Sequence, residues 1–375
     1  MMKNTKGITL VALVITIIIM LILAGISIQT ITQTNLFKKA EQAKEKTEQA
    51  QEKENEMLSN YIDSMNEYLP DTLADKVKKG KIEIGSYVNY SPDTINNEKY
   101  KELISNLATY SGNTNKDYNT AETIKQEELK WRILDVKDGQ VRLISAITGA
   151  KIGLTGYNAY NNGVKLLDDT CSTLYNSKKL ASKVQNLKIE DIGNKLKEKD
   201  YSKIDSNYGK TYTYKGLIAY PSMLLKDKEQ EVTIGGKTIK GTELGISEQN
   251  EYIKQETENE TADILKIKQT SWGKNMNKED FENSKYYELF IKNENYYNNY
   301  WLSSRCVSFI PAFADYCIYR VDVGLINGIS LYSSNPGTEL PEYRSCRPVI
   351  TLNSNVQIDT TNSGNGTENS PYNIK

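Results

Sequence analysis

The chain of 375 residues carries 47 basic and 48 acidic side chains, a formal net charge of -1, and no histidine. A near-neutral chain lacks the basic footprint of a nucleic-acid-binding protein, so nucleic acid is excluded as a partner. Without histidine, zinc metalloprotease sites and every Ser-His-Asp triad are excluded as well. We predict no cofactor, no metal site and no enzymatic activity.

An uncharged apolar run follows a short basic lead that contains Lys3 and Lys6. A bilayer core about 30 Å thick needs about 20 apolar helical residues, so residues 8–30 are predicted to form a transmembrane helix. The run is longer than the roughly 7–15-residue core of a secretory signal, and no small-residue cleavage site follows it. The positive-inside rule then predicts a single-pass protein of the cell membrane, with the N-terminus inside and the rest outside.

The junction KGITLV at residues 6–11 resembles the leader junction of type IV prepilins. The resemblance implies a leader over residues 1–7, cleavage by a prepilin peptidase between Gly7 and Ile8, and N-methylation of Ile8. Most pilins carry glutamate at the fifth mature position, where this chain has Ala12. It therefore implies a minor or tip-type pilin, or a pilin-derived anchor, with other pilin subunits as partners and a pilus as a location. A generic single-span membrane anchor is the alternative interpretation.

Residues 31–69 are predicted to form an extracellular helical stalk. Their centre is rich in Glu, Lys, Gln and Ala, which favour helices. Apolar side chains return at helical spacing between Met57 and Leu69, and Pro70 ends the helix. The simplest prediction is one continuous helix from Ile8 to about Leu69, roughly 90 Å long.

Residues 71–375 are predicted to form an α+β head, of one or two subdomains, with short strands and long loops. The clearest element is a β-hairpin at residues 129–147, in which two β-rich runs flank a Lys-Asp-Gly turn. Helices are predicted at residues 177–200 and 277–291, the second with Asn277 as its N-cap. Strands are predicted in the C-terminal third, at residues 299–307, 318–333 and 346–358.

A second resemblance covers most of residues 80–375. Its strongest parts are YWL at residues 300–302 and RPV at residues 347–349, with GNGTENSPY at residues 364–372 closing the series. These elements resemble an extracellular domain family of Gram-positive bacteria related to the C-type-lectin and formylglycine-generating-enzyme fold. The resemblance implies a C-type-lectin-like head whose long loops carry its function. The calcium-binding sugar motif of lectins and the active-site motif of formylglycine-generating enzymes are not recognisable, so neither property is carried over.

Aromatic and arginine side chains gather in the C-terminal region, and Tyr and Arg dominate binding hot spots. The chain has 26 tyrosines, which an AT-rich genome also favours. About half of the clustered aromatic residues are expected to be core. The predicted contacts to an extracellular ligand, a glycan or a protein, are Arg305, Phe309, Phe313, Tyr316, Tyr319, Arg320, Tyr332, Tyr343 and Arg344.

The predicted function is therefore that of a pilin-like adhesin or receptor, membrane-tethered or incorporated in a pilus, with a lectin-like head that resembles diversified variable receptors. An exported enzyme on the formylglycine-generating-enzyme scaffold and a purely structural minor pilin are the alternatives. Four cysteines permit three full disulfide pairings, and free thiols are the other possibility. These cysteines are Cys171, Cys306, Cys317 and Cys346.

Overall fold

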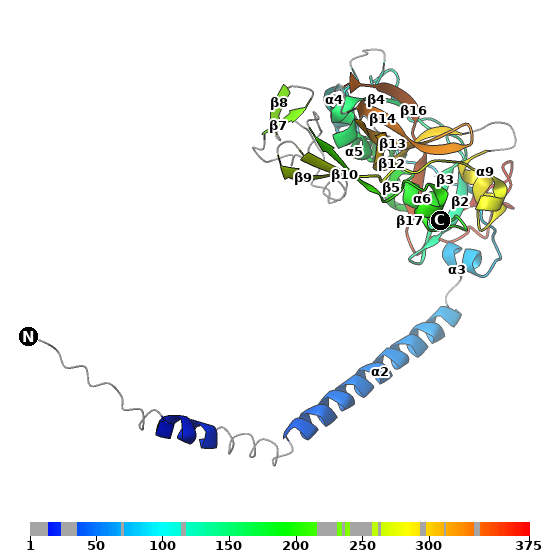
Figure 1. The fold of residues 1–375 in the computed structure, drawn as a ribbon. Helices are drawn as coiled ribbons and strands as arrows, with labels where there is room; N and C mark the ends of the chain where they lie inside the picture. Colours follow the sequence, from blue (N-terminus) through cyan, green and yellow to red (C-terminus); the bar gives the residue numbers. More distant parts are fainter. Residues whose placement is uncertain are drawn as a thin grey trace, which may run out of the picture. The chain divides into compact units, whose positions relative to one another are not determined.

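The chain divides into two units, Met1–Pro70 and Asp71–Lys375, drawn in Figure 1. The structure is a computed structural model, and it describes residues 14–23, 36–68, 71–113, 118–215, 231–234, 237–240, 257–261, 264–292, 298–310, 313–333 and 338–375.

The first unit contains helical residues 14–23 and the helix α2 (Leu36–Tyr68). Residues 14–23 are apolar except for Thr16. The helix α2 is long, but its described surface is mostly polar, with Met57 and Leu58 as exposed apolar residues, and it carries the exposed ion pair Lys44–Glu48 at 3.8 Å. Among the described residues, no helix combines the length and the apolar character needed to cross a membrane.

The predicted transmembrane helix over residues 8–30 is therefore wrong, and so is the single-pass membrane location that followed from it. The predicted cleavage site between Gly7 and Ile8 lies outside the described residues. The helix α2 ends at Tyr68, just before Pro70. This end is expected, because a proline disfavours helical geometry in the residue before it.

The head contains a mixed six-stranded sheet with strand order β18-β1-β2-β3-β17-β5. Only the β1–β18 pair is parallel among the described pairs of this sheet. In the β2–β3 hairpin, Asp138 and Gly139 have φ of 51° and 76°, as a two-residue type I′ turn requires, so the predicted hairpin is confirmed. The strands are β1 (Tyr87–Asn89), β2 (Trp131–Lys137), β3 (Gln140–Ser145), β5 (Ala181–Asn186), β17 (Pro348–Leu352) and β18 (Tyr372–Asn373).

A second sheet of seven described strands has the order β11-β14-β13-β12-β16-β4, with β15 paired to β14. Its centre is the long antiparallel pair of β12 and β13, and β12 pairs with β16 in parallel. The strands are β4 (Lys151–Thr155), β11 (Lys274–Asn275), β12 (Asn299–Ile310), β13 (Phe313–Asp322), β14 (Leu325–Ser333), β15 (Thr338–Glu339) and β16 (Pro341–Ser345).

Two smaller sheets complete the described strands. One has the order β6-β10-β9 and the other is the hairpin of β7 and β8. Their strands are β6 (Thr211–Lys215), β7 (Glu231–Ile234), β8 (Lys237–Lys240), β9 (Thr257–Thr261) and β10 (Ile264–Lys268).

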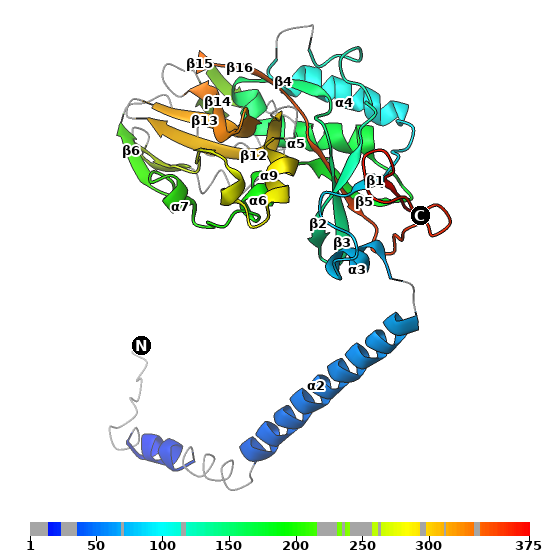
Figure 2. The same ribbon diagram turned by 90° about the vertical axis from the view of Figure 1, so that its right-hand side faces the viewer.

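The helix α5 (Gly156–Tyr175) packs on strands of both large sheets, as Figure 2 shows. Most of its residues are buried, because two sheets and the helix α4 surround it. A Cβ on Gly163 would lie 2.5 Å from Cδ1 of Ile318 on β13, so glycine permits this close approach. The other helices of the head are α3 (Leu73–Lys78), α4 (Asn97–Tyr110), α6 (Ile189–Gly193), α7 (Tyr201–Ile204), η2 (Lys278–Asp280) and α9 (Ser284–Phe290).

The predicted helix at residues 177–200 is wrong over its first half, where the chain forms β5. Its Lys, Leu and Glu content favours a helix, but pairing of β5 with β17 overrides that local preference. The prediction at residues 277–291 is only partly correct, because a 3-10 turn and α9 replace one helix and Asn283 caps α9. Strands occupy all three of the segments predicted in the C-terminal third.

Candidate functional site

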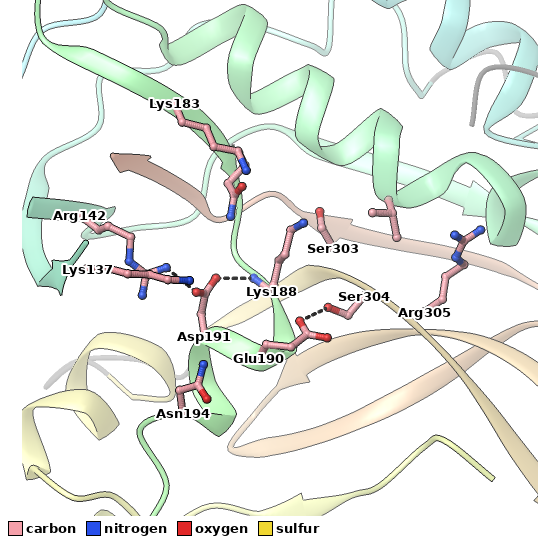
Figure 3. Close-up of a pocket in the computed structure, with 12 residues that line it drawn as sticks. Lys137, Arg142, Lys183, Lys188, Glu190, Asp191, Asn194, Ser303, Ser304 and Arg305 are labelled. Atoms are coloured by element: carbon pink, nitrogen blue, oxygen red, sulfur yellow. Dashed lines mark hydrogen bonds and ion pairs between the residues drawn. The ribbon is translucent and has the colours of Figure 1, made fainter. Parts of the chain in front are cut away.

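A polar pocket of about 380 Å³ opens where β5 of the first sheet, β12 of the second sheet and α6 come together (Figure 3). We call it the basic pocket. Five of its lining side chains are cationic and two are acidic. The lining residues are Lys137, Arg142, Val164, Lys183, Gln185, Lys188, Glu190, Asp191, Asn194, Ser303, Ser304 and Arg305.

A β-bulge in β12 brings three consecutive side chains to the pocket. Between the Trp301–Arg320 pair and the Arg305–Ile318 pair, β12 advances by four residues and β13 by two. In a regular strand Ser304 would face away from its two neighbours, because side chains alternate between faces. The bulge removes this alternation, so residues 303–305 all line the pocket.

One wall of the pocket is a charge-balanced cluster around Arg142. Its Nε and Nη2 donate to the two carboxylate oxygens of Asp135, each at 2.7 Å, and its Nη1 donates to Asp191. Lys195 Nζ also lies 2.7 Å from Asp135. Burial tends to raise the pKa of Asp135, but the hydrogen bonds and charges of Arg142 and Lys195 hold it below its ordinary value. Asp191 also accepts from the backbone N of Lys188 at 3.1 Å, which fixes the start of α6.

The opposite end of the pocket holds Arg305, which is only 7% exposed. Its Nη1 donates to the backbone carbonyl of Asn161 at 3.1 Å, and its guanidinium carbon lies 5.7 Å from the centre of the Tyr160 ring. Within the part of the chain that the structure describes, Arg305 has no ion pair with a carboxylate. A buried cation without a counter-ion is costly, and an anion bound in the pocket would reduce that cost.

Between these ends lie Lys188, Ser303 and the neighbouring Asp168. Lys188 Nζ is 3.9 Å from Asp168 Oδ2, and Figure 3 shows its side chain extending toward Ser303. Burial raises the pKa of Asp168, although Lys188 and Ser303 oppose the shift. The Ser303 hydroxyl is buried and lies beside the Asp168 carboxyl group. The site thus combines a buried hydroxyl with an ammonium group.

The electrostatic balance of the pocket is positive. Ser304 Oγ donates to Glu190 Oε2 at 3.0 Å, which holds this carboxylate at the α6 side of the pocket. Counting Asp135, Asp168 and Lys195 with the lining residues gives six cations against four anions. The arrangement is therefore suited to hold an anion, and polar side chains beside the cations can bind its hydroxyl or amide groups.

The nine ligand contacts predicted from sequence do not form one surface. Arg305 lines the basic pocket, whereas Tyr343 and Arg344 line a separate pocket of about 310 Å³. Tyr316, Tyr319 and Tyr332 are buried in the core. The half-buried residues that line neither pocket are Phe309, Phe313 and Arg320.

The contacts of these residues explain their positions. Tyr319 Oη donates to the Thr270 carbonyl at 2.8 Å and accepts from the Trp272 backbone N at 3.0 Å. The Phe309 ring stacks on Tyr212 with ring centres 3.6 Å apart. The Tyr316 ring packs against the Tyr160 ring of α5 with centres 5.2 Å apart, and the Tyr319 ring packs against Trp272 with centres 5.9 Å apart, so both tyrosines contact other side chains of the core.

Sequence reasoning did not find most of the basic pocket. Lys183, Lys188 and Glu190 belong to the segment that was predicted as one helix, and a helix would have distributed them around its surface. One signal was available, because Ser303 and Ser304 interrupt an aromatic and apolar strand directly before Arg305. Adjacent polar residues in such a strand indicate a bulge or a site.

No protein-family model matches the chain, and comparisons with curated proteins and with solved structures gave no significant match. The pilin and lectin resemblances stay predictions.

Proposed function

We propose that the head is a binding module, and that its basic pocket binds a small anionic ligand. The observation that carries this proposal is Arg305, a buried guanidinium with no carboxylate partner among the described residues. Lys188 and Ser303 stand beside the same cavity and supply an ammonium and a hydroxyl group. The guanidinium geometry favours a carboxylate, phosphate or sulfate group.

The proposed ligand class is a sugar that carries such an anionic group. The cavity volume of about 380 Å³ lies in the range of small-molecule sites. Gln185 Oε1 is a buried acceptor without a hydrogen bond in the described structure, and a sugar hydroxyl is a suitable partner for it. Binding of an acidic glycan is the role that an adhesin or receptor would perform.

Thermal unfolding of the full chain tests the proposal, with glucuronate and glucose 6-phosphate as probes and neutral glucose as the control. At roughly ten times Kd, a ligand of the native state stabilises it by about 1.4 kcal/mol. For a head of about 300 residues this raises the Tm by about 2 °C. We expect this shift from at least one anionic sugar and not from glucose.

The variant Arg305→Met removes the buried charge and should abolish the shift. Arg132→Met is the matched control, because Arg132 is a half-buried arginine outside the pocket that donates to the Gly85 carbonyl at 2.7 Å. The control should keep the wild-type response to the anionic sugar. An equal Tm shift in Arg305→Met, or an equal response to glucose, contradicts the proposal.

A further inference from the structure

The four cysteines lie in the head as two neighbouring pairs, and all four are buried as free thiols. Cys306 on β12 and Cys317 on β13 are direct partners across an antiparallel ladder. Directly opposite residues share one face of the sheet, with Cα atoms about 4.5–5.5 Å apart. This separation lies within the range of disulfide-bonded cysteines, about 4.4–6.8 Å.

The second pair joins α5 to the segment before β17. Cys171 Sγ donates to Asn186 Oδ1 at 3.7 Å, and the same oxygen accepts from the backbone N of Arg347 at 2.6 Å. The amide oxygen of Asn186 thus holds Cys171 close to Arg347, the residue directly after Cys346. Burial, and then a hydrogen bond with the Cys346 thiol, raises the pKa of the Cys171 thiol.

The packing of the core separates the two pairs. Cys171 and Cys346 belong to the hydrophobic cluster around α5, together with Trp131 and Leu174. Cys306 and Cys317 belong to the other cluster of the head. The two alternative pairings would each need two bonds between these separate clusters, so the packing disfavours them.

We propose that the head is oxidised at two specific sites, with disulfides Cys171–Cys346 and Cys306–Cys317. The oxidant class is a small or protein disulfide. One cysteine thiolate attacks the oxidant and releases its first thiol, and the partner thiolate then displaces the second thiol. The two electrons and the two protons given up by the cysteines end on the two thiols of the reduced oxidant. Because the four thiols are buried in the fold, the exchange takes place while the chain folds.

The space at Gly328 belongs to the second site. A Cβ at this position would lie 2.5 Å from Cys306 Sγ and 3.1 Å from Cys317 Cβ. The absence of a side chain on β14 therefore leaves room for the sulfur atoms between the strands. Cys306 directly follows Arg305, so the bond would also fix the strand that carries residues 303–305 of the basic pocket.

The test is oxidative refolding of the full chain in a buffer of reduced and oxidised glutathione. Remaining thiols are alkylated, and the protein is digested and mapped by mass spectrometry without reduction. We expect one linked peptide pair containing Cys171 and Cys346 and one containing Cys306 and Cys317. Linkage of Cys171 to Cys306 or Cys317, or four alkylated cysteines in the refolded protein, overturns the proposal.

Two double variants provide a check that does not depend on the connectivity map. Cys306→Ser with Cys317→Ser removes one site, and Cys171→Ser with Cys346→Ser removes the other. Each variant should retain the bond at the other site, and a reductant should lower its Tm by less than it lowers that of the wild type. A reductant that leaves the wild-type Tm unchanged contradicts the proposal, even where a double variant fails to fold.

Discussion

Replacing Arg142 with methionine removes the centre of a buried charge cluster. Arg142 makes two hydrogen bonds of 2.7 Å to Asp135 and one to Asp191, and the side chains of this cluster are nearly inaccessible to solvent. Methionine fills much of the same volume but supplies no donor. Asp135 keeps only Lys195 as a cationic partner, and Asp191 keeps the backbone N of Lys188.

Removing one partner of a buried ion pair costs about 3–5 kcal/mol, since the remaining charge stays buried. For a head of about 300 residues, this loss lowers the Tm by about 5–8 °C. The control is Lys165→Met, which breaks the exposed pair of Lys165 with Asp169 at 2.8 Å. An exposed pair contributes at most about 1 kcal/mol, so the control should remain within about 2 °C of the wild type.

The pH dependence of the same comparison has a definite sign. In the wild type, the pKa of Asp135 is below its ordinary value, so its contribution is present above about pH 4 and is lost as the pH falls through the folded pKa. Without Arg142, burial dominates and favours the protonated acid. The difference in unfolding free energy between wild type and variant should therefore be largest at neutral pH and shrink toward pH 4.

Urea denaturation at both pH values, followed by circular dichroism, measures this difference. A loss below about 1 kcal/mol at neutral pH would place the cluster among weak surface pairs. A loss that is equal at both pH values would show that Asp135 does not depend on Arg142 for its ionisation. Either result refutes the reasoning.

Two further predictions concern the backbone and a second buried acid. Gly112→Ala should destabilise the head far more than Gly80→Ala, because both glycines have positive φ but only a Cβ at Gly112 collides, 1.9 Å from the Thr155 carbonyl oxygen; similar Tm losses in the two variants would contradict this. Burial raises the pKa of Asp168, so its contribution is present below its unfolded pKa and is lost as the pH rises through the folded value. Asp168→Asn should therefore gain stability relative to the wild type between about pH 4 and pH 8 in urea denaturation, and an unchanged difference would exclude this role.

Local signals explain which parts of the fold were predictable. The β2–β3 hairpin depends on Asp138 and Gly139, whose sequence selects the turn without help from distant residues. The strand β5 depends on pairing with β17, and more than 150 residues separate the two in sequence. The local propensity of residues 177–200 favours a helix. Local propensity contains no information about a distant strand partner, so it does not predict β5.

The candidate site was less accessible to sequence reasoning than the fold. An aromatic cluster in sequence does not show which side chains of a central strand face inward, and Tyr316, Tyr319 and Tyr332 prove to be core. The basic pocket combines residues from β5, α6 and β12, and its use of Ser304 depends on a register shift. Register is a property of paired strands, so one strand alone does not reveal it.

The two buried arginines of the basic pocket should respond in opposite ways to the same substitution. Arg142 has two carboxylate partners, so Arg142→Met leaves buried charges behind and lowers stability. Arg305 has none in the described structure, so Arg305→Met removes a buried charge and leaves no unpaired acid. We expect a Tm at or above that of the wild type for Arg305→Met, together with the loss of anion binding. A residue that costs stability but supports binding is expected at a functional site, whereas a Tm loss in Arg305→Met as large as that in Arg142→Met would assign Arg305 to the structural core.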